Sequence, residues 1–594
     1  MHRHPFSGPT QLWWGDGAQT KRPRNLFHDI EQDDVPPSSD MFRAGGLIDD
    51  AGNVTDRAHL HSLMSSLDRR TTAVSEPADN RKLPAGYTYL LQFIAHDMVD
   101  SVPSFGISGR NIIPGARNAR LAPLMLETLY GSSPDEVPHA YMLTERQLQN
   151  GLVPRIRLRV GRRASTTPGG HPSPERDPYC PFRDIARNTS QKTADGVQDA
   201  SEHLTEAMLA DVRNDAHALI SQLTILFQLL HNHVISLLEG ATTPTAETLR
   251  LPPGELAYRE FECARMVVTL IYRNIIEKDV LRRILDTRIH RRYLIEKKPL
   301  LDRGKGIPQE FSFGAFRFAH AIVRDSYKLN SFSSEGATDE ALLLSASLAH
   351  LNEMGIDPLV KLPLKENWFV DWAHFFENSK GIEPNFSRKI APHYPVALSV
   401  APITFPIKVP GVDAGGLMHR DLVSAAFAGV LSVPALIRTA REKGIEIIED
   451  FSVWQGRLRT WLNSIEHLFS PSDVSRLVED PPLPFFVLFE AAGIGRTDEA
   501  DCGERLGPLG SLIVAETILG SMAEHPLGVE GSTLKERISD CGEIIFNMEA
   551  TSPPSPASGA MPVAVCAALS EIDEIEGMSA LLEYMERVNL FTQD

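Results

Sequence analysis

The chain has 594 residues, of which 42% are hydrophobic and 23% charged, the composition of a globular protein with a large core. Its net charge of −18 argues against a dedicated nucleic-acid binder, because phosphate binding depends on a basic surface. The five scattered cysteines form no CxxC pair, which argues against a disulfide framework or a thiolate metal cluster.

The beginning of the chain, MHRHPFSGPTQLWWGDG, lacks the continuous apolar segment of a secretory signal. No stretch approaches the run of about 18 apolar residues that predicts a membrane-spanning helix. We therefore expect a cytoplasmic protein without a membrane span. The sequence gives no indication of its oligomeric state.

Residues 1–84 are rich in Pro, Gly, Asp and Arg, and we expect them to form an arm packed on a larger body. A buried helix is predicted over 87–98, YTYLLQFIAHDM, before a loop-rich region that extends to about residue 190. The strongest predicted helix covers 203–240, where HALISQLTILFQLLHNHVISLLEG is strongly periodic and ends at Gly240.

Further helices are predicted near 257–286, 312–328, 340–353, 418–443, 451–469, 508–524 and 575–588, whereas alternating strand patterns are scarce. Residues 551–594 are expected to form a linker, TSPPSPASG, and a short C-terminal helix. The predicted fold is therefore mainly α, with one large helical domain over 85–550, long loops and little β structure.

Three groups of polar residues stand out within these helices. Gln92 and His96 are four residues apart and share one helix face, with Asp97 about a quarter-turn away. Arg213 and His231 are five helical turns apart, with His217 one turn after Arg213. Each group also has a simpler interpretation: a satisfied core histidine in the first, and a surface arginine at a helix start in the second.

The third group, Arg317 and His320 in AFRFAHAIVR, lies three residues apart within a wall of phenylalanines. A histidine in such a wall is either a core residue or an axial ligand to a flat hydrophobic cofactor.

Together these segments resemble the animal-type haem peroxidase superfamily, which includes myeloperoxidase and the cyclooxygenases, and in particular its bacterial branch. The stretches that carry the resemblance occur in the family's order: LLQFIAHDMVD (90–100), LETLYGSSPDE (126–136), ADVRNDAHALISQLTILFQLLHNHVI (210–235), FGAFRFAHAIVRDSYKLN (313–330) and GERLGPLGSLIVAETILG (503–520). The resemblance implies a helical fold in which haem lies between core helices.

The resemblance also implies roles for individual residues. His96 matches the distal histidine, Gln92 the distal glutamine and Arg213 the catalytic distal arginine. His320 matches the proximal ligand of the haem iron, and Arg317 an arginine that helps to anchor the haem environment. The implied substrates are hydrogen peroxide and a small reductant, organic or halide. A neutral imidazole suits the transfer of the peroxide proton, and a guanidinium suits stabilisation of developing negative charge.

Three departures from the family pattern modify these expectations. Ala95 and Ala216 stand where the mammalian enzymes carry the Asp and Glu that form ester links to haem, so a non-covalent haem b is expected. Asp97 matches a calcium ligand and Glu127 lies in the corresponding loop, but Met125 replaces an acidic residue there. Calcium needs about six oxygen ligands, so an empty site is as well supported as a filled one.

The third departure lies at the proximal partner. Asp421 stands where the family has an asparagine bonded to the proximal histidine. A carboxylate there increases the basicity of the ligand. A helix cap is the alternative role for Asp421.

Two other functions stay open at this point. One is a fatty-acid or metabolite dioxygenase or oxidase of the same fold. It ranks lower because the radical-bearing Tyr of the cyclooxygenases, three residues before the proximal histidine, is replaced by Arg317. The other is a haem-binding protein without turnover, against which the set His96, Arg213 and His320 argues. The reducing substrate is not indicated.

Overall fold

The computed structural model describes residues 24–27, 38–50, 52–73, 75–102, 117–118, 120, 122–143, 155–164, 173–189, 204–249, 253–300, 306–331, 363–364, 368–395, 398, 416–495, 502–527, 532–547 and 560–592. The predicted helix at 340–353 and the predicted linker at 551–559 lie outside these residues.

The described chain is mainly helical, as predicted. Its α-helices are α2 (Arg57–Thr72), α3 (Gly86–Met98), α4 (Glu127–Tyr130), α5 (Ala218–Leu249), α6 (Pro253–Ile275), α7 (Leu281–Ile284), α8 (Thr287–His290), α9 (Gln309–Ser312), α12 (Leu417–Ala428), α13 (Val433–Glu442), α14 (Phe451–Leu462), α15 (Pro471–Glu479), α16 (Leu483–Ala491), α17 (Pro508–Glu524), α18 (Leu534–Asn547), α19 (Ala560–Ala568) and α20 (Met578–Arg587). Short 3₁₀ segments are η1 (Ser38–Asp40), η2 (Ala44–Gly46), η3 (Pro138–Ala140), η6 (Val212–Asp215), η9 (Ala315–His320) and η12 (Trp372–His374), and π-helical turns are η7 (Ile276–Val280) and η8 (Arg291–Ile295).

Strands in the described chain occur in five antiparallel pairs. These pairs are β1 (Asp79–Pro84) with β10 (Phe386–Arg388), β2 (Ser101–Val102) with β3 (Arg117–Asn118), β4 (Tyr141–Met142) with β5 (Arg157–Leu158), β6 (Val160–Arg163) with β7 (Arg183–Ile185), and β8 (Arg187–Thr189) with β9 (Leu204–Ala207). A two-stranded pair is too small to form a hydrophobic core of its own, so these pairs join loops that pack on the helices.

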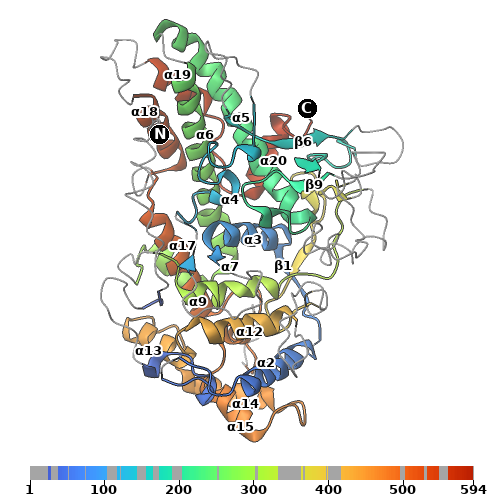
Figure 1. Ribbon diagram of the computed structural model, residues 1–594, viewed down its shortest axis with the longest axis vertical. Coiled ribbons are helices and arrows are strands. Elements are labelled where there is room, and N and C mark those ends of the chain that lie inside the picture. The colour runs from blue at the N-terminus through green and yellow to red at the C-terminus, as the bar shows by residue number, and fades with distance from the viewer. Residues whose placement is uncertain are drawn as a thin grey trace.

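The helices form two groups with α3 between them (Figure 1). At one end α5 and α6 pack together, and α18 and α19 pack against them. At the other end α2 packs on α12, and α14 contacts α13 and α15. The part of the predicted arm that the structure describes, including the unpredicted helix α2, thus lies against elements from the C-terminal half of the chain.

Aromatic contacts fix the position of α3. Phe93 stacks on Phe227 of α5 at 5.1 Å between ring centroids and meets Tyr272 of α6 edge-on at 6.0 Å. Tyr87, at the start of α3, donates its hydroxyl hydrogen to Asp279 at 2.6 Å. Such aromatic pairs add specific geometry to the burial of apolar surface, so α3 is held in register against α5 and α6.

Helix α5 contains a segment, Ala218–Thr242, that is long and apolar enough to cross a membrane. Its most apolar window is 89% buried inside the protein, as expected for a core helix. The apolar composition of α5 is thus accounted for by burial against its neighbours.

Several predicted boundaries were wrong. The helix predicted over 203–240 begins at Ala218, because Leu204–Ala207 pairs with β8 and Asp211 caps the separate η6 turn. The helix predicted over 312–328 is a short 3₁₀ turn that ends at His320. The helix predicted over 418–443 is broken at Gly429, which adopts a left-handed conformation with φ of 71° that favours glycine.

Candidate active site

The face of α3 that carries Gln92 and His96 is the partly open side of a buried helix. Gln92, Ala95 and His96 are half-buried, whereas the other residues of α3 are buried. Positions i, i+3 and i+4 lie on one helix face, so these three side chains border the same space. The small side chain of Ala95 leaves that face open between the two polar groups.

A buried amide fixes which ring nitrogen of His96 carries the proton. Nδ1 of His96 lies 2.8 Å from Oδ1 of Asn214. Asn214 is fully buried and donates its Nδ2 hydrogens to the carbonyl and the hydroxyl oxygens of Thr128 at 3.3 and 3.1 Å. These bonds turn Oδ1 towards the imidazole, so Nδ1 must carry the proton. Nε2 of His96 is therefore the atom with the lone pair.

The electrostatic surroundings keep His96 neutral. Burial, followed by the charge of Arg213, lowers the pKa of His96 to about 4, although the bond to Asn214 acts in the opposite direction. At neutral pH the ring is therefore an unprotonated base.

Gln92 is held by a second histidine. His217 accepts the backbone N–H of Ile220 at its Nδ1 and donates from Nε2 to Oε1 of Gln92 at 2.8 Å. Burial, with a smaller contribution from His96, lowers the pKa of His217 to about 3, which is consistent with this neutral tautomer. The arrangement leaves the amide nitrogen of Gln92 as its donor on the face shared with His96.

Arg213 lies at the C-terminal end of α3. Its guanidinium donates to the carbonyl oxygens of His96 and Val99, each at 2.7 Å, and to the carboxylate of Asp211 at 2.6 Å. Most of its N–H groups thus bond to protein oxygens. Its positive charge acts on the His96 ring through space and not through a hydrogen bond to that ring. A cation at this position also complements the negative end of the α3 dipole.

Asp211 joins two arginines at the C-terminal end of α3. It bonds to Arg213 and to Arg120, and Arg120 also donates to the carbonyl oxygen of His96 at 2.8 Å. Burial acts to raise the pKa of Asp211, but the hydrogen bond and charge of Arg213, with Arg120, lower it to about 2. This ion cluster fixes the end of α3 and hence the backbone of His96.

Asp97 points away from this face. Its carboxylate accepts the backbone N–H groups of Leu126 and Thr128 at 3.0 and 3.2 Å. The same turn is held by Arg273, which donates to the carbonyl oxygen of Leu124 at 2.9 Å. Leu124 and Leu126 both have positive φ, and these bonds offset the strain of that conformation.

Calcium binding by Asp97 and Glu127 stays a prediction. In the described part of the chain, one group of three acidic or histidine side chains is close enough to share a metal ion, and it contains neither residue. In this turn, backbone amide hydrogens bond to the Asp97 carboxylate, and the Arg273 guanidinium bonds to the carbonyl oxygen of Leu124. In a calcium site, the cation would bind such oxygens instead.

On the other side, η9 places His320 against a buried carboxylate. Nδ1 of His320 donates to Oδ2 of Asp421 in α12 at 2.8 Å, and Tyr394 donates to the same oxygen at 2.8 Å. The Asp421 side chain is 4% exposed and that of His320 is 29% exposed. The bond occupies Nδ1 and leaves Nε2 as the atom of the partly exposed ring that could bind a metal.

Positive neighbours keep Asp421 ionised. Burial acts to raise the pKa of Asp421, but the charges of His320 and Arg317, with hydrogen bonds from His320 and Tyr394, lower it overall. Arg317 lies 3.6 Å from Oδ1 of Asp421 and donates from Nε to the carbonyl oxygen of Ser312 at 2.8 Å. Asp421 is thus a hydrogen-bonded anion within α12, and Gly416 rather than Asp421 occupies the N-cap of that helix.

The two histidine groups belong to neighbouring elements. Helix α3 packs against η9 and against η6. Ala216 is half-buried, as is Ala95. Neither methyl group can form an ester, so the chain offers no covalent anchor for a haem at these two positions. An imidazole backed by a carboxylate is a chemically suitable ligand for haem iron.

Sequence reasoning missed Asn214, Asp211 and Tyr394. Asn214 and Asp211 lie close to Arg213 in the sequence, but nothing in their spacing indicates that Asn214 bonds to His96 or that Asp211 pairs with Arg120. Tyr394 lies in a segment without a periodic signal. His231 is a satisfied core histidine, bonded to Tyr130 and to the carbonyl oxygen of Ile156.

No protein-family model matches the chain, and no curated protein matches its sequence. Its fold is similar to that of peroxidase A from Dictyostelium discoideum, at 13% identity and a TM-score of 0.41, covering 87% of this chain and 90% of that one. It is also similar to fatty acid alpha-dioxygenase from Arabidopsis thaliana, at 13% identity and a TM-score of 0.44, with 88% and 74% covered.

The corresponding dioxygenase from Oryza sativa gives 13% identity and a TM-score of 0.46, with 89% and 79% covered. Likeness at this level carries no argument about activity. The functional interpretation therefore rests on the side chains of this chain.

Proposed function

We propose that this protein is a haem-dependent peroxidase, in which His320 binds the iron of a non-covalent haem b and His96 is the acid–base group. One observation carries the proposal. Two imidazoles on packed elements, α3 and η9, each have Nδ1 bonded to a side-chain oxygen, of Asn214 and of Asp421. Nε2 is thus the atom through which His96 would transfer protons and His320 would bind iron.

When bound, the haem supplies the electrons that cleave the peroxide O–O bond, and two reductant molecules return them one at a time. Hydrogen peroxide becomes two waters in the overall reaction. Nε2 of His96 accepts the first peroxide proton and returns it to the departing oxygen. A neutral imidazole is required for the first transfer, and the low pKa of His96 provides it at pH 7.

The surrounding residues orient this proton transfer. Asn214 keeps the resident proton of His96 on Nδ1, so that Nε2 is always the basic atom. The amide nitrogen of Gln92 donates to an oxygen bound on the same face. Arg213 contributes positive charge at the end of α3, which favours negative charge developing near His96.

On the proximal side, Asp421 accepts the Nδ1 hydrogen of His320 and so makes Nε2 a more strongly donating ligand. Tyr394 and Arg317 hold Asp421 in place. A strongly donating ligand favours oxidised iron, which suits a peroxidase.

The test uses the full chain purified with haem supplied. We expect a haem absorption spectrum that changes on addition of hydrogen peroxide and recovers when a phenol or iodide is added. The variant His96→Ala is expected to bind haem and to lose about 100-fold or more of the rate with peroxide, the usual size of an acid–base contribution. His233→Gln is the matched control, because His233 bonds to Tyr584 away from α3.

Three results would overturn the proposal. If no haem binds, the role of His320 is wrong. If haem binds and peroxide leaves its spectrum unchanged, the protein is a haem binder without this turnover. If oxygen is consumed with a fatty acid and no peroxide is needed, the protein is a dioxygenase.

A further inference from the structure

A second cluster of ligand-type side chains lies outside the haem site. Asp177, Asp371 and His374 come together although the first two are 194 residues apart in sequence, and their candidate ligand atoms all lie within 4.8 Å of one another. The two aspartates are fully buried and His374 is 6% exposed. Buried carboxylates are rare unless they are paired or bound to a metal.

The hydrogen bonds of Asp177 and Asp371 leave one buried oxygen unused. Asp177 accepts from the backbone N–H and the hydroxyl of Ser331 at 2.6 and 2.5 Å. Oδ1 of Asp371 accepts the backbone N–H of Tyr179 at 3.1 Å and that of Ala373 at 3.2 Å. Oδ2 of Asp371 is buried and has no hydrogen-bond partner among the described residues. Such an atom calls for a partner of another kind, such as an ion.

His374 is oriented like a metal ligand. One ring nitrogen bonds to the backbone carbonyl of Glu383, which leaves the other for the cluster. A carbonyl that holds the far nitrogen of a ligating histidine is the common second interaction of protein metal sites.

Three side chains with possible ligand atoms therefore converge in a buried place, two carboxylates and an imidazole. Two carboxyl groups that share a buried site favour either a bound cation or a shared proton between them. Lys328 acts on Asp371 and His374, but its side chain is exposed. Any two ligands of one ion lie at most two bond lengths apart, about 4 to 5 Å, so the observed spacing suits a single ion.

We propose that Asp177, Asp371 and His374 bind one divalent transition-metal ion, for which zinc is the best match, as a structural site separate from the haem. Mixed imidazole and carboxylate ligands favour zinc over calcium or magnesium, which prefer oxygen alone. A water molecule completes four-fold coordination.

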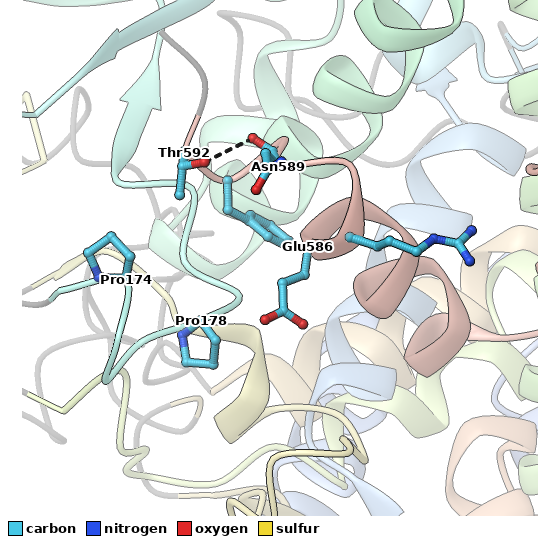
Figure 2. A pocket seen from close by; sticks show the side chains of 7 residues that line it. Pro174, Pro178, Glu586, Asn589 and Thr592 are labelled. Atoms are coloured by element: carbon cyan, nitrogen blue, oxygen red, sulfur yellow. Dashed lines mark hydrogen bonds between the residues drawn. The ribbon is translucent and has the colours of Figure 1, made fainter.

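The position of the cluster indicates what the ion would stabilise. Asp177 lies between Pro174 and Pro178, which line one side of a surface hollow, while Asn589 and Thr592 line the other (Figure 2). The ring of Tyr179, two residues further along the chain, packs against that of Phe591 with 6.0 Å between the ring centroids. An ion that ties residue 177 to residues 371 and 374 therefore also fixes the loop on which the end of the chain packs.

The test measures zinc and manganese in the haem-loaded protein, with haem measured separately by its absorbance. After chelation and dialysis, addition of zinc alone is expected to restore about one bound ion per chain and to raise the melting temperature. Asp371→Asn and His374→Gln are expected to lose most of the bound zinc and to keep their haem.

Asp480→Asn is the matched control, because Asp480 also has a buried oxygen without a partner but is not part of such a cluster. It is expected to keep its zinc. If the chelated wild-type protein binds no zinc or manganese, the cluster holds a shared proton instead and the proposal is overturned. The same conclusion follows if both cluster variants bind as much metal as the wild type. If either variant fails to fold, metal binding by the wild-type protein decides alone.

Discussion

The bond between Asn214 and His96 gives the sharpest prediction about activity. Asn214→Leu removes the acceptor of the Nδ1 hydrogen and leaves that hydrogen buried without a partner. The loss of such a bond costs about 1 to 2 kcal/mol, which corresponds to about 5- to 30-fold in rate. We expect kcat/KM for hydrogen peroxide at pH 7 to fall by that factor while haem content is unchanged.

The pH profile separates this role from a merely structural one. The wild-type peroxide rate is expected to fall as pH decreases through about 4, where His96 becomes protonated. Asn214 raises the pKa of His96, so Asn214→Leu moves this limb to lower pH. Asn214→Asp places an anion beside the ring and moves it to higher pH, by at least about one unit.

Stopped-flow mixing with a pH jump measures both variants before acid can unfold them. The reasoning is refuted if both variants stay within about twofold of the wild-type rate at pH 7 with normal haem content. It is also refuted if the acid limbs of both variants move in the same direction. The leucine should lower the pKa of His96 by removing a hydrogen bond, whereas the aspartate should raise it by adding a negative charge.

Three further predictions concern the rest of the site. Asp421→Asn replaces an anionic hydrogen-bond acceptor of His320 with a neutral one, a difference of about 1 to 2 kcal/mol. The reduction potential of the bound haem should therefore rise by about 50 to 100 mV in a spectroelectrochemical titration. An unchanged potential would contradict the role of the carboxylate. Because the pKa of Asp211 falls from 3.8 to about 2 on folding, the carboxylate contributes about 2 to 3 kcal/mol above pH 5, and this stability is lost as pH falls from about 4 through 2. Urea unfolding should therefore show that Asp211→Asn costs this amount at pH 7 and little at pH 2, and an equal cost at both would exclude an ionic role. With Ala95 and Ala216 in place, acidified butanone should extract all the haem, and haem retained on the denatured chain would show a covalent link.

Local sequence patterns were enough to predict the helical class and most of the helices near the site. The period of apolar residues placed α3 within one residue of its observed limits, because a buried helix shows which of its faces are apolar. The resemblance to haem peroxidases singled out His320 and Asp421, and the structure joins them by a hydrogen bond across 101 residues. The resemblance alone did not distinguish this bond from a helix cap.

What the sequence by itself determined is the helical class, the positions of several core helices such as α3, and that no ester can form at Ala95 or Ala216. The tertiary structure alone decided the protonation of His96 through Asn214, the bonds of Arg213 to backbone carbonyls, and the meeting of Asp177 with Asp371. The physical reason is range. A helix face repeats every few residues and is visible in the sequence, whereas a side-chain bond between distant segments depends on how the whole core packs.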